Sequence, residues 1–412
     1  MPSWLLTVFL LSACAVEKKG ILVNVEPGTP MDESDLYQHC DLGDQAACVL
    51  AGEKNAPAPL PSLPIIQGMA PPDRAVFAVL EGKGTSLFWY IYDRDARKLT
   101  KIFTPKPLNR GHSSYSLQRL DARGLLPNRS YELLAGDADG RLVEDRAFRP
   151  LATEESPLRA EIFTGWSAAS HEARLQLLAA AHARKPHFFV LAGSTVNATL
   201  PPESAGINGR ASRDFFFERH AEARASFELG LEHELVPVAT LWNEDEFGKH
   251  NGGTSFPQRD EAREMMELFF PHWSDESGIV NGPGISVAFD FQPIELILAD
   301  DLSFRRAPLG GELKCSKGKG HPREVCKREK LVPAPAGTRY GPLFLNWVIN
   351  RSEKAGRPLW LLTDGPNIVP YSANWQLQPA LQATDLSAPP GIAGLFELAA
   401  ERGKPATLSP LR

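Results

Sequence analysis

Acidic and amide side chains gather in two short segments of this 412-residue chain, where buried strands are expected to end. Residues 243–246 follow the apolar run 236–241, and residues 300–301 follow the run 295–299. Carboxylate and carbonyl oxygens are the ligands that hard cations such as Ca2+ and Mg2+ take in proteins. The candidate ligands are Asp245, Glu246, Asp300 and Asp301, with Glu244, Asn243, Asn197 and His250 to complete the set.

The same residues also have a structural interpretation. Asp300 and Asp301 could simply cap the end of a strand, and residues 244–246 could form a solvated turn. Residue types and spacing alone leave the cation site and the structural interpretation both open.

After residue 152, short apolar runs alternate along the chain with amphipathic segments. These are the strands and helices that would position the candidate residues. This alternation predicts an α/β fold with a layered sheet, in which ligands sit beyond the carboxyl ends of the strands. We expect strands at 159–163, 187–192, 236–241, 285–290, 295–299 and 359–363, and helices at 171–184, 214–234, 259–270 and 343–353.

Residues 62–152 are predicted to form a separate β domain. Apolar and aromatic runs at 75–80, 86–92, 98–103 and 130–134 have the composition that strands favour. The segment 120–134 resembles the turn-then-aromatic pattern of fibronectin-like sandwiches. We therefore expect a small fibronectin/Ig-like β-sandwich, close to the roughly 100 residues usual for such modules.

The strand ends, taken together, resemble motifs of the PhoD-like (alkaline phosphatase D type) metallophosphoesterases over roughly residues 62–375. The resemblance implies a small β-sandwich followed by a layered phosphoesterase core at 153–412. It also implies phosphate mono- or diester substrates and a divalent metal cofactor, either Ca2+, Mg2+ or an Fe/Ca pair. The matching residues are Trp242, Glu246, Phe247 and Gly248 for the family's W-D-D-H-[DE]-[FY]-G, and Asp300, Ser303, Phe304 and Arg305 for L-D-x-R-S-x-R.

The metal-binding positions of the family are substituted. Ser194 stands in place of the aspartate of the G-D motif, Asn197 in place of a tyrosine, and Asn243-Glu244-Asp245 in place of D-D-H. A two-metal centre needs anionic ligands to hold cations about 3.5–4 Å apart, and a serine hydroxyl cannot bridge them as a carboxylate does. The resemblance therefore implies a degenerate site at the family-equivalent positions Ser194, Asn197, Asn243, Glu244, Asp245, Asp300 and Arg305.

The N-terminus predicts export and a lipid anchor. Residues 1–13 form an apolar stretch too short to span a bilayer, as in a secretory signal peptide. The segment 11–14 (Leu-Ser-Ala-Cys) resembles a bacterial lipobox, which implies diacylation of Cys14 and anchoring to the cell envelope, at the outer membrane or the periplasmic face. Residues 14–61 would form a tether.

The four remaining cysteines fall into two local pairs, Cys40 with Cys48 and Cys315 with Cys326. In an oxidising compartment each pair could form a disulfide that closes a short loop, with a stabilisation of at most about 3 kcal/mol. Four reduced thiols or a zinc site are the alternatives. The second pair lies in a basic run, 314–330, which is interpreted as a solvated loop, a lid or an anionic-lipid contact.

Composition and charge limit the classes of function that the protein can have. The formal net charge is -6, which gives no support to nucleic-acid binding, since that function requires a basic face. Two hypotheses follow: a non-catalytic binding or envelope protein with a phosphoesterase fold, or a divergent phosphoesterase with a rebuilt site. The first would bind a ligand such as a phosphate ester without turning it over. The sequence specifies neither a substrate nor an oligomeric state.

Overall fold

The computed structural model describes most of residues 61–363 and three short strands outside that range, namely β1 (Pro30–Met31), β21 (Gly394–Ala399) and β22 (Thr407–Pro410). The predicted signal peptide, most of the tether, and Cys14, Cys40 and Cys48 lie outside the described residues. Within 61–363 the gaps are 103–104, 138–141, 152–158, 202–206, 208, 251, 275–277, 292–293, 306–308, 311–313, 318–323, 328–331, 334–340 and 356–358.

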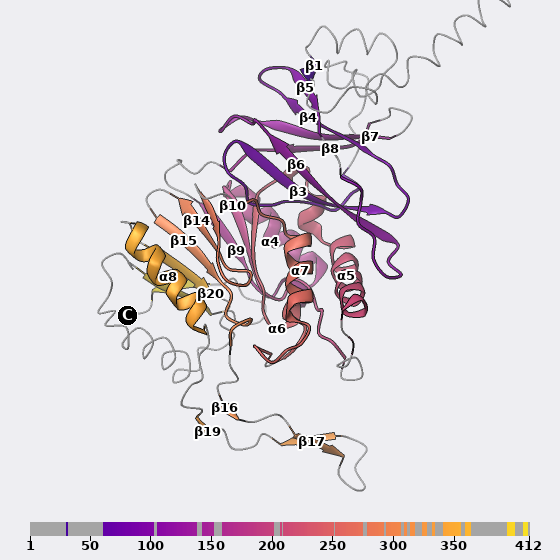
Figure 1. The fold of residues 1–412 in the computed structure, drawn as a ribbon. Helices are drawn as coiled ribbons and strands as arrows, with labels where there is room; N and C mark the ends of the chain where they lie inside the picture. The colour runs from indigo at the N-terminus through magenta and orange to yellow at the C-terminus, as the bar shows by residue number, and fades with distance from the viewer. Residues whose placement is uncertain are drawn as a thin grey trace, which may run out of the picture.

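Two β-sheets form the N-terminal region, and they share one core (Figure 1). One sheet has the order β2-β3-β6, and the other has the order β1-β5-β4-β7-β8-β11. Alternate residues of β3, such as Phe77 and Val79, pack against Trp89 and Leu133 of the facing sheet. The strands are β2 (Ile65–Gln67), β3 (Arg74–Gly82), β4 (Phe88–Asp93), β5 (Lys98–Lys101), β6 (Tyr115–Arg123), β7 (Tyr131–Gly136), β8 (Leu142–Phe148) and β11 (Glu234–Leu235).

A three-stranded parallel sheet of order β12-β10-β9 follows, so the chain belongs to the α/β class. Side chains of β10 alternate between its two faces, as a strand buried on both sides requires. Phe189 and Leu191 face the helices, whereas Phe188 and Val190 face a second sheet. The elements are β9 (Ala160–Phe163), α4 (His171–Ala183), β10 (Phe188–Ala192), α5 (Arg210–Ala225), β12 (Val238–Leu241), α6 (Glu244–Phe247) and α7 (Arg259–Phe269).

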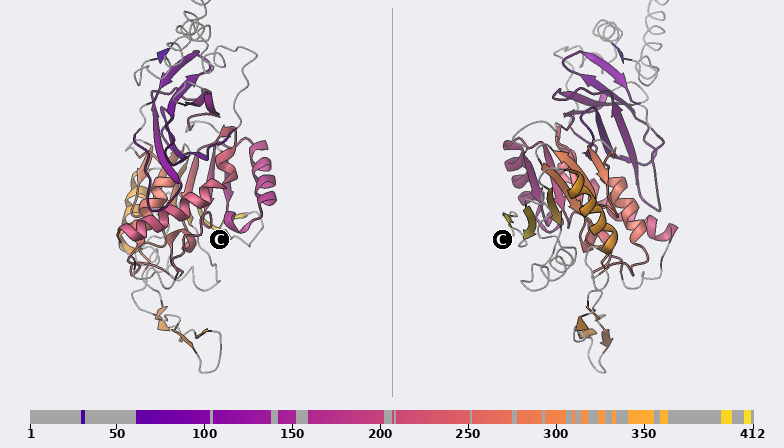
Figure 2. Two further views of the ribbon diagram at one scale, coloured as in Figure 1. Left: turned by 90° about the vertical axis from the view of Figure 1, so that its right-hand side faces the viewer. Right: turned by 60° about the vertical axis from the view of Figure 1, so that its left-hand side comes forward.

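The second sheet of this region has the order β13-β14-β15-β20-β21-β22. Phe289 and Leu298 pack against the first sheet, whereas Ala288 and Ile297 pack against α8. The result is four layers, with α4, α5 and α7 on one outer face and α8 on the other (Figures 1 and 2). The elements are β13 (Ile279–Asn281), β14 (Val287–Phe291), β15 (Ile294–Ala299), α8 (Gly341–Ala355) and β20 (Leu359–Thr363).

Several predicted boundaries differ from the structure, and two of these differences have a clear physical reason. The helix expected at 214–234 ends as α5 at Ala225, and a 3-10 helix at Glu228–Leu231 and strand β11 follow it. Leu235 of β11 joins the core between the N-terminal sheets, and this long-range packing outweighs local helical periodicity. The strand expected from 236 begins at Val238, because Pro237 has no N–H to donate to a ladder.

Two strand pairs in and beside the basic run project from the layered body (Figures 1 and 2). Strand β17 (Lys314–Lys317) pairs antiparallel with β18 (Glu324–Lys327), and β16 (Leu309–Gly310) pairs with β19 (Val332–Pro333). The register places Cys315 directly opposite Cys326, and the disulfide between them stays a prediction. Among the helices that the structure describes, none is long and apolar enough to cross a bilayer.

Candidate functional site

The carboxyl ends of β10 and β12 bring Ser194, Asn243 and Asp245 together. The two strands are parallel neighbours with Ala192 opposite Leu241, so the loops that follow them meet at one edge. The Ser194 hydroxyl donates to Asp245 Oδ2 at 3.1 Å and accepts a hydrogen bond from Asn243 Nδ2. Three of the predicted positions thus form one polar cluster, in which all three residues are half-buried.

Ser194 adopts a left-handed backbone conformation with a φ of 52°. This conformation is uncommon for a residue with a Cβ and persists only where the surroundings hold it. The main-chain oxygen of Ser194 accepts a hydrogen bond from Ser167 N at 2.6 Å, and its main-chain N–H donates to Glu246 Oε2 at 3.2 Å. These bonds fix the loop so that the hydroxyl points at Asp245.

Glu246 is fully buried, and its carboxylate holds the two loops together. It accepts hydrogen bonds from Asn243 N at 2.9 Å and from Val196 N at 2.9 Å. It also accepts from both the main-chain N–H and the hydroxyl of Thr195, the latter at 2.8 Å. Burial raises the pKa of the Glu246 carboxyl, and the N–H donors oppose that shift. This residue is therefore a structural tie and not part of a solvated turn.

The short helix α6 begins with a capping box that explains this arrangement. The Asn243 side chain accepts from Asp245 N at 2.8 Å, and Glu246 reaches back to the N–H of Asn243. Sequence reasoning missed this role for Glu246. The signal was present, since an asparagine followed three residues later by glutamate is a typical helix start.

Asp300 is a second buried carboxylate that main-chain and indole N–H groups surround. Its Oδ1 accepts from Trp242 Nε1 at 3.0 Å and from Ser303 N at 2.9 Å, and its Oδ2 accepts from Ile285 N at 3.1 Å. Gly284, with a φ of 67°, lies so close to Oδ2 that a Cβ there would collide with it. Asp300 therefore ties the ends of β12 and β15 together, and Asp301 beside it is also buried.

Glu244, Arg305 and His250 form a separate, more exposed group. Arg305 Nη2 donates to Glu244 Oε1 at 2.7 Å, and His250 Nδ1 lies 3.4 Å from Glu244 Oε2. Arg305 Nε also donates to the main-chain oxygen of Gly252 at 2.9 Å. Asn197 lies further along the loop after β10, where its side chain accepts from Thr199 N at 3.3 Å. No described hydrogen bond links Asn197 to Ser194 or Asp245.

The side chains at the strand ends do not fit a two-metal centre. Among the described residues, no group of three or more His, Cys, Asp or Glu side chains is arranged to hold a metal ion. The carboxylates of Glu246 and Asp300 already accept several N–H donors each. Asp245 is the half-buried carboxylate of the cluster, and its Oδ2 accepts from the Ser194 hydroxyl.

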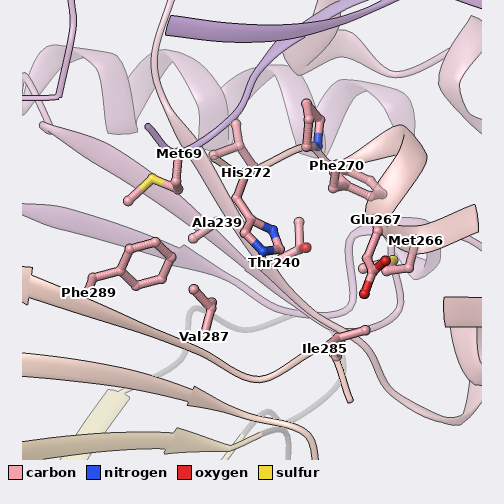
Figure 3. A pocket seen from close by; sticks show the side chains of 12 residues that line it. Met69, Ala239, Thr240, Met266, Glu267, Phe270, His272, Ile285, Val287 and Phe289 are labelled. Carbon is pink, nitrogen blue, oxygen red and sulfur yellow. The ribbon is translucent and has the colours of Figure 1, made fainter. Parts of the chain in front are cut away.

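The described structure includes two grooves and one small cavity. A groove of about 480 Å3 runs beside the strand ends, and a larger one of about 800 Å3 lies along β5 and β6. Figure 3 shows the small cavity, where Thr240, Glu267 and His272 line a space of about 20 Å3. Such a space holds about one water molecule and is too small for a substrate.

Comparison with known proteins adds no family assignment. No family model matches the chain, and no curated protein matches it. Among solved structures, amylomaltase from Corynebacterium glutamicum is similar at 16% sequence identity with a TM-score of 0.18. The match covers 46% of this chain and 28% of that chain, so this chain spans less than a third of that protein. A TM-score of 0.18 does not indicate a common fold.

Proposed function

We propose that this protein is an exported lipoprotein in which a PhoD-like phosphoesterase fold serves for binding instead of metal-dependent catalysis. The order of the elements along the chain supports this proposal, since a region of two mainly antiparallel sheets precedes layered sheets that are covered by helices on both outer faces. The polar cluster lies at the carboxyl ends of β10 and β12, where α/β sheets bind ligands.

The observation that carries the proposal is how the carboxylates at the strand ends are engaged. Glu246 and Asp300 are buried and surrounded by N–H donors, while Ser194 and Asn243 occupy two positions where the resemblance implies charged metal ligands. Binding a cation at Glu246 or Asp300 would break bonds that hold the loops in place. The geometry favours a rigid, hydrogen-bonded site over a two-metal site.

A divergent phosphoesterase is the second candidate, and one observation favours it. Asp245 and Ser194 place a carboxylate oxygen and a hydroxyl oxygen together in a half-buried cluster, and oxygen ligands suit one hard cation. If this candidate is correct, the cation is Ca2+, Mg2+ or the Fe/Ca pair that the resemblance implies.

Elemental analysis and a hydrolysis assay separate the two candidates. The purified mature lipoprotein should contain no stoichiometric metal. It should also not hydrolyse 4-nitrophenyl phosphate or bis(4-nitrophenyl) phosphate when Ca2+, Mg2+ or Fe2+ is added. A bound metal, together with turnover that Asp245→Ala abolishes, would establish the phosphoesterase instead.

A gain-of-ligand variant sharpens the test. The double substitution Ser194→Asp with Asn243→Asp supplies two carboxylates at the strand ends and should raise the affinity for divalent cations in calorimetry. Ser226→Asp, which adds one charge at the exposed end of α5, is the matched control and should leave that affinity unchanged.

The lipid anchor has its own test. Cys14→Ser should release the protein from the membrane fraction into the soluble fraction, because the acylated thiol would be lost. Membrane association that is unchanged in this variant would contradict the anchor without affecting the proposal about the strand ends.

A further inference from the structure

The groove beside the strand ends has the size of a small-molecule site. It is formed by the loop that follows β10, by the middle of α5 and by His250 after α6. Its volume of about 480 Å3 lies within the range of about 300–1,000 Å3 that is usual for ligand sites. Two main-chain bonds fix the loop, Ala198 N to Asp245 O at 3.0 Å and Leu200 N to Gly248 O at 2.9 Å. A groove held in this way loses little entropy when it binds.

The lining combines an apolar face with flat polar groups. Phe215, Leu200 and Pro201 supply the apolar part, and Phe215 is half-buried with its ring packed edge-on to Phe216 at 5.6 Å. A half-exposed ring of this kind can pack against the C–H face of a ligand ring.

Three polar side chains, those of Asn197, Arg219 and His250, complete the lining. Amide, guanidinium and imidazole groups can each form hydrogen bonds with ligand hydroxyl groups. The groove therefore offers both an apolar surface and several hydrogen-bonding groups.

The charged side chains of the groove indicate whether its ligand is charged or uncharged. Arg219 Nη1 is paired with Glu222 Oε2 at 2.9 Å, and His250 Nδ1 lies 3.4 Å from Glu244 Oε2. Each group of the lining that carries or can carry positive charge thus has a carboxylate beside it. A phosphate or carboxylate ligand would need a positive charge that is not already compensated. The lining therefore favours an uncharged ligand that is rich in hydroxyl groups.

Two hydrogen-bonding groups at this groove have no partner among the described residues. The Thr199 hydroxyl is shielded from solvent and forms no hydrogen bond. Rotation about its Cα–Cβ bond would exchange the hydroxyl with the methyl group of the same side chain. The Asn197 side chain uses its oxygen to accept from Thr199 N, which leaves its NH2 group available.

From this geometry we infer that the groove binds a saccharide, with a sugar ring packed on Phe215 and its hydroxyl groups bonded by Asn197, Thr199 and Arg219. The inference rests on the proposed binding function and names the ligand class for it. A saccharide supplies what the lining lacks: an uncharged ring with one C–H face and many hydroxyl donors and acceptors.

The test uses the full mature lipoprotein in detergent and in EDTA. We expect it to bind glycans on an array of bacterial and eukaryotic saccharides. Calorimetry with the best-bound array glycan should give an affinity that falls about tenfold in Phe215→Ala. The matched control is Arg210→Gln, whose side chain on the first turn of the same helix is 90% exposed, and it should bind as the wild type does.

Thr199→Val keeps the shape of the side chain and removes only the hydroxyl. Its affinity for the same glycan should fall by about three- to tenfold, while its thermal midpoint should not fall, because the hydroxyl bonds to nothing in the free protein. A merely structural role for Thr199 would lower the midpoint and leave the affinity unchanged.

Three results would overturn the inference: no glycan bound, glycan binding that Phe215→Ala leaves unchanged, or displacement of the glycan by inorganic phosphate. The outcome is distinguishable from failure of the proposed function. A metal-free, inactive protein that binds no glycan would refute the saccharide alone. Glycan binding in EDTA by a protein that hydrolyses phosphate esters when metal is added would refute only the non-catalytic function.

Discussion

At the scale of single residues, burial decides what each acidic side chain does. Glu246 and Asp300 are as deeply buried as core leucines, yet each accepts several N–H donors. The carboxylate of Asp245, which is half-buried, accepts from a serine hydroxyl instead. Buried carboxylates with complete hydrogen bonding stabilise one loop geometry, because breaking any of those bonds leaves a polar group unsatisfied.

Glu81 in β3 is a buried carboxyl that makes stability depend on pH. Burial raises its pKa from 4.5 to about 7, and the indole of Trp89 opposes the shift by hydrogen bonding. The folded state therefore binds the proton more tightly than the unfolded state does. The contribution of Glu81 to the free energy of unfolding should be largest below pH 4.5 and should fall, by up to about 3 kcal/mol, as pH rises towards 7.

Urea unfolding at pH 5 and pH 8 checks this pH dependence. Glu81→Gln should be more stable than the wild type at pH 8, and its stability should change less between the two pH values. Glu172→Gln, an exposed change on α4, is the control. Equal pH dependence in Glu81→Gln and in the wild type would show that Glu81 is not the group responsible.

At the scale of elements, the ends of strands from two different sheets are joined through one carboxylate. The Trp242 indole, at the end of β12, donates to Asp300, at the end of β15. Ser286 Oγ accepts from Asp300 N at 2.9 Å, which adds the start of β14 to the same junction. Asp245 lies three residues after Trp242, which this junction holds in place. The position of Asp245 at the edge of the sheet therefore depends on the junction.

Asp300→Asn should destabilise the fold. The amide replaces one carboxylate oxygen with an NH2 group, which cannot accept from Ile285 N or, in the other orientation, from Trp242 Nε1. We expect the free energy of unfolding to fall by about 2–3 kcal/mol. Asp260→Asn on α7, where the side chain is 66% exposed, should change it by less than about 0.5 kcal/mol. An unchanged urea midpoint for Asp300→Asn would contradict the structural role.

At the scale of the whole molecule, a buried ion pair connects the N-terminal sheets with the α/β region. Glu144 and Arg146 in β8 are both fully buried and paired. Glu144 Oε2 accepts from Ser62 Oγ at 2.8 Å, while Arg146 Nη2 donates to Leu63 O at 2.7 Å and Nη1 to Gly230 O at 3.3 Å. The pair thus binds the segment before β2 and the segment before β11 at one point.

Arg146→Met should weaken this connection strongly. The substitution leaves the Glu144 carboxylate buried without its counter-ion and removes the donors to three main-chain oxygens, those of Leu63, Gly230 and Glu232. A loss of about 3–5 kcal/mol is expected for breaking such a pair. Differential scanning calorimetry should show a lower thermal midpoint than for Arg149→Met, an exposed change three residues along the chain. Equal midpoints for the two variants would contradict the connection.

The local pattern of apolar residues in the sequence was sufficient to predict the positions of many strands. Apolar runs predicted the positions of β3, β4, β10, β14 and β20, because buried strands need apolar side chains on one or both faces. The end of α5 could not be predicted, since it depends on Leu235 packing between sheets that form more than 80 residues earlier in the chain.

The sequence by itself determined which residues follow each strand, and therefore that Ser194, Asn243 and Asp245 would be near a sheet edge. Only the tertiary structure decided which carboxylates remain available, because burial and hydrogen-bond partners come from segments distant in the chain. Glu246 meets Val196, 50 residues away, and Asp300 meets Trp242, 58 residues away. The sequence gives the type of each polar residue and its place after a strand. Only tertiary packing fixes the neighbours of that residue, and these neighbours determine its chemistry.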